Sequence, residues 1–243
     1  MPEVKYTQYF NPRRIAALAI SAASLLCYHH SALADTRFSS FNNNFSNDIP
    51  VDFSLSFSRK DLDLKSSSTT YSVRLRRINA KLSNEISQNI NIGLILGSNF
   101  ISQENDVATA GLSLNGNHIG FALNGIFGND LRLGINASDI YQEANGGNTL
   151  RTASIAWHEW MTEATLRFKL GTHWAILAGA GIMGLDADRR VSGDINETIR
   201  MELTDNFQGK LAIEIFTAPA DRIRLTLNQG AFNGPQLTFA HAF

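Results

Sequence analysis

The sequence predicts an all-β fold, a transmembrane antiparallel up-and-down β-barrel of about ten strands, and three observations lead to this prediction. Apolar and polar residues alternate with a period of two over most of the chain after residue 50. Short and long polar connectors follow one another in turn between the alternating segments. The last segment, residues 236–243, alternates in the same way and ends on Phe243, whereas soluble domains more often end in loose polar residues.

The first 34 residues are typical of a secretory signal peptide. Basic residues precede an apolar run over residues 15–26, and a small-x-small cleavage site ends at Ala34. The run is too short for a membrane helix, which needs about 20 apolar residues. A lipoprotein signal at Cys27 is the alternative, although Leu26 stands where that signal wants a small residue. We therefore predict export and cleavage near Ala34.

Export defines the mature chain. We predict a signal peptide over residues 1–34, an Asn- and Ser-rich periplasmic leader over 35–49 and a barrel over 50–243. Of 21 basic and 22 acidic residues in the whole chain, the signal removes three and one, which leaves 18 and 21. No basic excess therefore favours nucleic acid as a partner. The single cysteine, Cys27, leaves with the signal, so the mature chain can form no disulfide.

The connectors determine the predicted number of strands. Four are short, at residues 83–88, 128–130, 171–173 and 218–221. Five are long and polar: KDLDLKSSS, SQENDVA, QEANGGNT, LDADRRVSGDIN and QGAFNGP. Hairpins that are tight at one end and long at the other are expected of an outer-membrane barrel. The order gives ten strands with both termini on the short-turn side, and twelve or eight strands remain alternatives.

Three segments are about twice the 9–11 residues that a spanning strand needs, namely residues 107–127, 150–170 and 197–217. Polar breaks near Asn115 and His158 shift the alternation of the first two by one residue, which predicts a β-bulge in each. The third keeps its parity across Thr204, which favours one continuous strand.

The orientation of the faces separates a membrane barrel from a soluble β-sandwich, which alternates in the same way but points its apolar side chains inward. Long cations fill the polar face, and aromatic residues near strand ends match the interfaces of a bilayer. The predicted interface aromatics are Tyr71, Phe100, Tyr141, Trp157, Trp160 and Trp174. The predicted lumen-facing polar network comprises Asp52, Arg74, Arg76, Arg132, Arg167, Lys169, Glu202, Glu214, Arg222 and Arg224, with Glu163 as a further acidic partner.

Taken together, these features resemble a small outer-membrane β-barrel protein of Gram-negative bacteria. Members of that family end on an alternating strand with a terminal aromatic, which the barrel-assembly machinery recognises. Leu237, Phe239 and Phe243 match this C-terminal insertion signal, and His241 departs from it because an apolar or aromatic residue is usual there. The resemblance implies an outer-membrane location, with outer-membrane lipid and lipopolysaccharide as partners. We also predict a monomer; no functional subfamily follows.

The sequence predicts no catalytic residue, cofactor or metal site. Glu159 follows His158 directly, so the two side chains point to opposite sides of a strand. His118 has no acidic residue nearby in sequence that would suit acid–base catalysis, His173 lies in a tight turn beside Trp174, and His241 points to the predicted lipid face. A pair of His and acid assembled from distant strands is the alternative. The acidic and basic residues over 185–194 lack the spacing of a calcium loop. That segment is either a plain solvated loop or a contact for divalent-bridged phosphates of lipopolysaccharide.

The inward cations have two interpretations. Side chains largely fill the interior of a barrel of eight to ten strands, so a charge-paired network would have a structural role. An excess of cations could instead line a narrow, anion-favouring pore. We therefore predict an envelope-structural role or the passive passage of small solutes. A loop-mediated binding or adhesion barrel is the alternative, and an outer-membrane enzyme comes third.

Overall fold

The computed structural model describes residues 51–103, 106–128 and 131–243, and the predicted signal peptide, cleavage site and leader lie outside these residues. Among the described residues, no helix is long and apolar enough to cross a bilayer. Eleven strands make up the fold: β1 (Val51–Ser66), β2 (Thr69–Ser87), β3 (Ile90–Gln103), β4 (Ser113–Phe127), β5 (Leu131–Gly147), β6 (Arg151–Leu170), β7 (Trp174–Gly193), β8 (Glu197–Leu203), β9 (Phe207–Phe216), β10 (Asp221–Gly230) and β11 (Gly234–Ala242).

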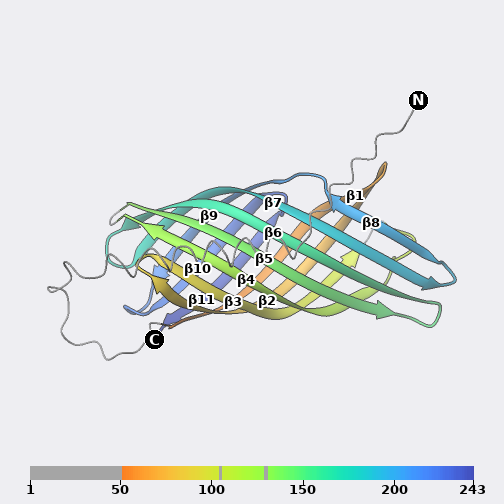
Figure 1. Ribbon diagram of the computed structural model, residues 1–243, viewed down its shortest axis with the longest axis horizontal. Coiled ribbons are helices and arrows are strands. Elements are labelled where there is room, and N and C mark those ends of the chain that lie inside the picture. The colour runs from red at the N-terminus through yellow and green to blue at the C-terminus, as the bar shows by residue number, and fades with distance from the viewer. Residues whose placement is uncertain (1–50, 104–105, 129–130) are drawn as a thin grey trace, which may run out of the picture. The chain divides into compact units, whose positions relative to one another are not determined.

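Ten of these strands form a closed antiparallel ring (Figure 1) in the order β1-β2-β3-β4-β5-β6-β7-β9-β10-β11. The pairing of β11 with β1 closes the ring, and the backbone N–H of Phe243 donates to the carbonyl of Val51 over 2.9 Å. Closure matters because an open sheet edge in hydrocarbon would leave backbone groups without hydrogen-bond partners. The predicted ten-stranded up-and-down barrel is confirmed, with β8 as an additional strand that pairs with β7 and with the end of β1.

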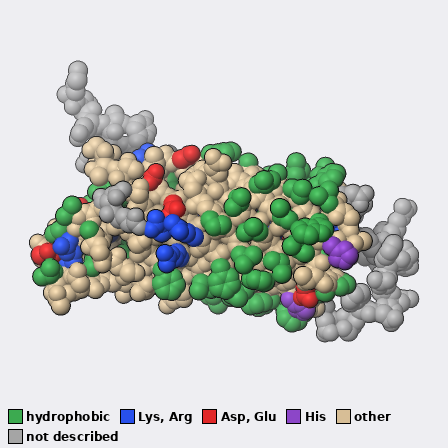
Figure 2. Space-filling view, turned by 180° about the vertical axis from the view of Figure 1, so that it is seen from behind, with side chains coloured by type: hydrophobic (Ala, Val, Ile, Leu, Met, Phe, Trp, Pro, Cys, Tyr) green, Lys and Arg blue, Asp and Glu red, His purple; other side chains and the backbone are tan. Residues whose placement is uncertain are grey.

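An apolar surface covers the outside of the half of the barrel that ends in the short turns (Figure 2). We call this surface the apolar belt. Its exposed side chains include Phe57, Ile78, Leu94, Ile119, Leu123, Trp160, Leu166, Trp174, Ile176, Leu211, Leu227 and Phe239. Residues of alternate parity on the same strands face the lumen, and many of these are polar. The arrangement is that of a barrel whose outer wall faces lipid.

Beyond the belt, β1 to β7 continue away from the short turns and β8 joins them, at the right-hand end of Figure 1. We call this part the head. Its outer face is polar and its inner face is apolar, the reverse of the belt. The inward side chains form one buried core, which includes Leu62, Leu64, Val73, Leu75, Ile101, Leu114, Ile155, Trp157, Met183, Leu185, Val191, Met201, Leu203 and Phe232.

This reversal explains the shifts of alternation in two long segments, and the predicted β-bulges are wrong. The pairing of β6 with β5 and β7 runs through His158 without a register shift, and that of β4 runs through Asn115 in the same way. In β6, Trp157 points inward into the head core while Trp160, three residues later, points outward into the belt. The backbone alternation is unbroken, and what changes along the strand is the medium outside it.

The predicted long connectors are also mostly strand. Only Ser67 and Ser68 separate β1 from β2, and the residues expected in a loop before them continue β1. The segment over residues 197–217 breaks after Leu203 instead of running on. Both β8 and β9 pair with β7, but on its other side β8 reaches Leu64 of β1, whereas β9 pairs with β10. The short β9, β10 and β11, of ten, ten and nine residues, do not extend into the head as their neighbours do.

The predicted interface aromatics divide between the two faces. Phe100, Tyr141, Trp160 and Trp174 lie exposed on the outside. Trp157 is only 2% exposed, and Tyr71 packs against the head core. Both lie in the head, where the outer medium is water and burial therefore favours the inward side.

Arginine in place of Leu123 tests the outward orientation of the belt. We expect Leu123→Arg to reduce the free energy of unfolding by about 2–4 kcal/mol, because a cation near the middle of the bilayer is poorly solvated. Denaturant titration of the protein refolded into lipid vesicles measures this change. Asn117→Arg is the matched control on the same face of β4, beyond the belt, where about 0–1 kcal/mol is expected. Equal effects of the two substitutions would show that the belt does not face lipid.

Candidate functional site in the charged lumen

Polar and charged side chains line the lumen within the belt. They come from strands whose outward faces carry the belt, because inward and outward positions alternate along each strand. We call the hydrogen-bonded and ion-paired members the lumen network, which falls into three groups. It consists of Arg77, Asn99, Asn136, Gln142, Glu159, Glu163, Arg167, Lys210, Glu214 and Arg224.

The upper level of the network lies next to the head core and crosses the lumen. Arg77 of β2 donates to both carboxylate oxygens of Glu159 of β6, at 2.8 and 3.3 Å. These strands are four positions apart in the ring of ten, and therefore nearly opposite. The oxygen of Gln142 accepts from Arg77 and from Asn99, each at 2.8 Å. All four side chains are buried, and the two charged ones are 2% and 3% exposed.

The lower level, nearer the short turns, contains three ion pairs that converge from three strands. Lys210 of β9 pairs with Glu163 of β6. Glu214 of β9 is fully buried and pairs with Arg167 of β6 and with Arg224 of β10, whose Nε donates over 2.8 Å. One carboxylate thus serves two guanidinium groups. Because a buried charge without a partner is strongly unfavourable, these pairings fix the side chains that meet in the lumen.

Several of the residues predicted to face the lumen do face it. Arg167, Glu214 and Arg224 join the network, and Glu163 takes the acidic role expected of it. The remaining inward positions are Asp52 and Arg222, which are half-buried, and Arg132 and Lys169, which have inward parity but are exposed at the short-turn rim.

Three predicted lumen residues lie on the outer face instead. Arg74 pairs with Asp61 over 3.1 Å, Arg76 is exposed, and Glu202 lies 3.5 Å from Lys65. All three lie in or beside the head, where water surrounds the wall and polar side chains face outward. The prediction that these residues face the lumen is therefore wrong, for the same reason that Trp157 faces inward.

The sequence analysis missed the upper level of the network. Arg77 has the parity opposite to Arg74 and Arg76, which were predicted to face the lumen, and Glu159 directly precedes Trp160, a predicted interface aromatic. The shift of alternation could have revealed it, because each shift marks the level along the strand where inward positions change from apolar to polar.

A second buried polar cluster lies at the far end of the head core. Arg189 of β7 is fully buried, and donates to Gln103 at 2.9 Å and to Glu197 at 2.8 Å. It also pairs with Asp106 and lies over the ring of Tyr71, 5.0 Å from its centroid. Residues 185–194 were predicted to form a loop, and all of them except Asp194 belong to β7; a contact of this segment with lipopolysaccharide phosphates stays a prediction. Within the described residues, no group of three or more His, Cys, Asp or Glu side chains could hold a metal ion.

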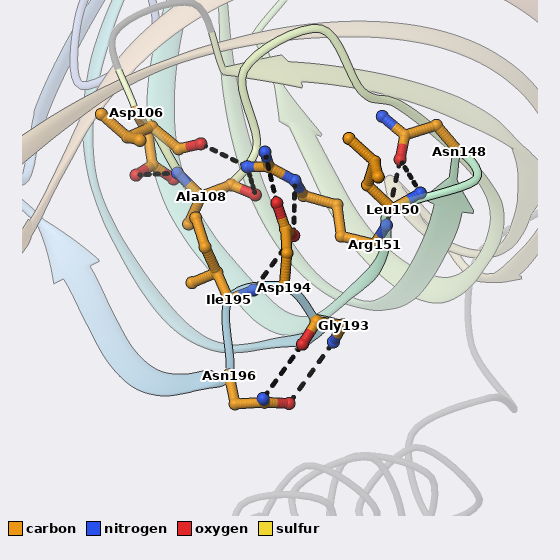
Figure 3. Close-up of polar contacts among 10 residues, drawn as sticks. Asp106, Ala108, Asn148, Leu150, Arg151, Gly193, Asp194, Ile195 and Asn196 are labelled. Carbon is orange, nitrogen blue, oxygen red and sulfur yellow. Dashed lines mark hydrogen bonds and ion pairs between the residues drawn. The ribbon is translucent and has the colours of Figure 1, made fainter.

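The outermost turns of the head are joined to each other (Figure 3). Arg151, at the start of β6, donates to Asp194 at 3.1 Å and to the carbonyl groups of Val107 and Ala108 at 2.6 and 3.3 Å. Three connections that are distant in sequence therefore meet at one guanidinium group. The head ends in a fixed rim.

The four histidines that the structure describes, His118, His158, His173 and His241, lie in different environments. His158 contacts Asp139 over 2.8 Å on the outer wall, on the face opposite Glu159. His118 is buried in the lumen, beside Gly97 of the next strand, where an added Cβ would lie 2.6 Å from the ring. His173 contacts Thr172 in a short turn.

His241 of the C-terminal strand lies 2.6 Å from Asp221 and packs edge-on against Phe243. Phe239 and Phe243 are exposed on the outside, and Leu237 is half-buried. Recognition of these residues by the assembly machinery stays a prediction.

The closed ring, the apolar belt and the charge-paired lumen define a small outer-membrane β-barrel. Solved structures with a similar fold are outer-membrane barrels too. The β-domain of the Bordetella autotransporter BrkA has a TM-score of 0.48 and 13% identity over 81% of this chain and 99% of that one. The Escherichia coli outer-membrane protease OmpT has a TM-score of 0.47 and 11% identity over 82% and 96%. No protein-family model and no curated protein sequence matches the chain.

Substitutions in the upper level test whether the ion pair across the lumen is a coupled unit. We expect Glu159→Leu to reduce the free energy of unfolding by about 3–5 kcal/mol, because it leaves Arg77 buried without its carboxylate. The double variant Arg77→Met/Glu159→Leu should recover most of this loss, since no uncompensated charge remains. Denaturant unfolding in lipid vesicles, followed by tryptophan fluorescence, gives both values. Additive losses in the double variant would contradict the coupling.

Proposed function

We propose that this protein is a closed outer-membrane barrel with an envelope-structural role. The observation that carries the proposal is the combination of a charge pair across the lumen, Arg77–Glu159, and an apolar core directly above it. A solute moving along the barrel axis would have to separate this ion pair and then pass through the apolar core.

The charge pair opposes conduction because its groups are already desolvated and hydrogen-bonded. Arg77 has two acceptors, Glu159 and Gln142, and Asn99 fixes the amide. An ion that displaced this arrangement would leave buried charges without partners, which is unfavourable by several kcal/mol. The pair therefore supports a closed lumen.

The head core adds a second barrier of a different kind. Leu75 and Trp157 are the next inward residues beyond Arg77 and Glu159 on the same strands, and both are buried in the head core. Apolar constrictions block the passage of ions by excluding water. Together, the two levels favour the structural role over a passive pore.

The lower level bears on the anion-favouring pore. Such a pore needs cations that attract a solute. Here Arg167 and Arg224 share the carboxylate of Glu214, and Lys210 pairs with Glu163. These pairings support charge neutralisation within the wall, and the proposal includes no catalytic activity.

A binding or adhesion role for the head is the second candidate. The observation that favours it is the fixed rim, in which Arg151 joins three connections and Arg189 anchors Asp106 and Glu197. A preorganised surface loses less conformational freedom on binding than mobile loops do. This role is compatible with a closed lumen.

Planar-bilayer recording tests the closed lumen. We expect the refolded wild-type barrel to give no steady conductance. Trp157→Ala should produce brief openings, because it removes the largest side chain of the apolar barrier. Trp160→Ala is the matched control on the outer face of the same strand, and should stay silent. Steady anion-selective openings of the wild type would contradict the proposal and favour the pore.

A further inference from the structure

We propose that Arg59 and Arg76 form a binding site on the outer wall for the phosphate group of an anionic lipid in the outer leaflet. The inference rests on the outer-membrane location and not on the closed lumen of the proposed function.

The level of the site is set by the belt. Phe57 and Ile78 are opposite each other on β1 and β2, and are 41% and 40% exposed on the outer wall. Arg59 and Arg76 are the next pair on that face, two residues further toward the head. A displacement of two residues along a strand is about 7 Å. The guanidinium groups therefore lie where the hydrocarbon ends and the lipid headgroups begin.

Within the described residues, the two arginines have little negative charge close to them. Like charges directly opposite each other on a sheet are destabilising, and Arg59 and Arg76 are such a pair. Arg76 forms no ion pair with any residue that the structure describes, and Arg59 approaches only Asp61, at 4.0 Å. Asp61 lies closer to Arg74, at 3.1 Å. A ligand that supplies negative charge would relieve the repulsion.

The neighbours of the pair suit a lipid rather than a free anion. Phe100, 43% exposed, is opposite Arg76 on β3, so an aromatic side chain lies directly beside the site. Figure 2 shows basic side chains gathered where the apolar side chains of the wall end. Two guanidinium groups can bind phosphate through parallel hydrogen bonds, while the apolar wall below accommodates acyl chains.

Lipid binding to the detergent-solubilised, refolded chain tests the site. The probe is hexa-acylated lipid A with two phosphates. We expect Arg59→Gln/Arg76→Gln to weaken binding about tenfold or more, since each lost charged contact corresponds to roughly a factor of ten. Arg190→Gln, an exposed arginine of β7 in the head, is the matched control and should bind as the wild type does. Equal affinity of the double variant and the wild type would overturn the proposal.

Two further probes identify the source of the phosphate. Dephosphorylated lipid A should bind to the wild type and to the double variant with the same low affinity. Inorganic phosphate alone should not raise the melting temperature of the wild type. A wild-type response to inorganic phosphate as large as that to lipid A would overturn the lipid assignment, and so would tight binding of the dephosphorylated lipid.

A stability measurement separates a lost site from a lost fold. Without lipid A, the double variant should melt at or above the wild-type temperature, because the repulsion between the two arginines is gone. With lipid A, only the wild type and Arg190→Gln should gain stability. A double variant that melts well below the wild type without lipid would give the pair a structural role and overturn the proposal. The bilayer recordings of the closed lumen do not depend on any of these results.

Discussion

The structure depends on one constraint: each strand keeps its strict alternation of faces while the medium outside it changes from lipid to water. Within the belt, apolar side chains face outward because lipid surrounds the wall, and polar ones must enter the lumen. In the head, water surrounds the same strands, so burial of apolar surface drives the opposite choice. In β6, Trp157 and Glu163 share the inward face, one in an apolar core and the other in an ion pair. Along each long strand, the position where the apolar face changes from outward to inward therefore marks the boundary between lipid and water.

The lumen network follows from this constraint. A polar inward face in a barrel of ten strands has little room for water, because side chains fill the interior. In the ion pairs of the lumen network, the partner comes from another strand: Arg77 pairs with Glu159 across the ring, and Glu214 pairs with Arg167 and Arg224. Replacement of a buried pair by apolar groups need not destabilise a protein. The pairs in this lumen are therefore better explained by the alternation of the strands, which places polar side chains inside wherever the outer face is apolar, than by a gain in stability alone.

The sequence predicts the architecture better than the site. Alternation and connector order are local properties, and they suffice for an all-β barrel of ten strands and for the outward position of residues such as Leu166 and Phe168. The parity shifts at Asn115 and His158 were visible as well, but a bulge and a change of medium leave the same pattern in a single strand. The pairing of Arg77 with Glu159 joins positions 82 residues apart. Which strands lie opposite each other depends on how the whole ring closes, so the sequence of a single strand does not determine it.

The boundary also explains why a repulsive pair of arginines persists on the wall. On a surface in contact only with water, Arg59 opposite Arg76 would weaken the β1–β2 hairpin. One step toward the short turns, Phe57 and Ile78 face hydrocarbon; one step toward the head, Asp61 and Arg74 form an ion pair of their own. The unbalanced charge is confined to the level where the membrane itself carries anionic groups. The same change of medium that directs charges into the lumen on the belt side therefore leaves charge exposed at its edge, where we propose that lipid supplies the counter-charge.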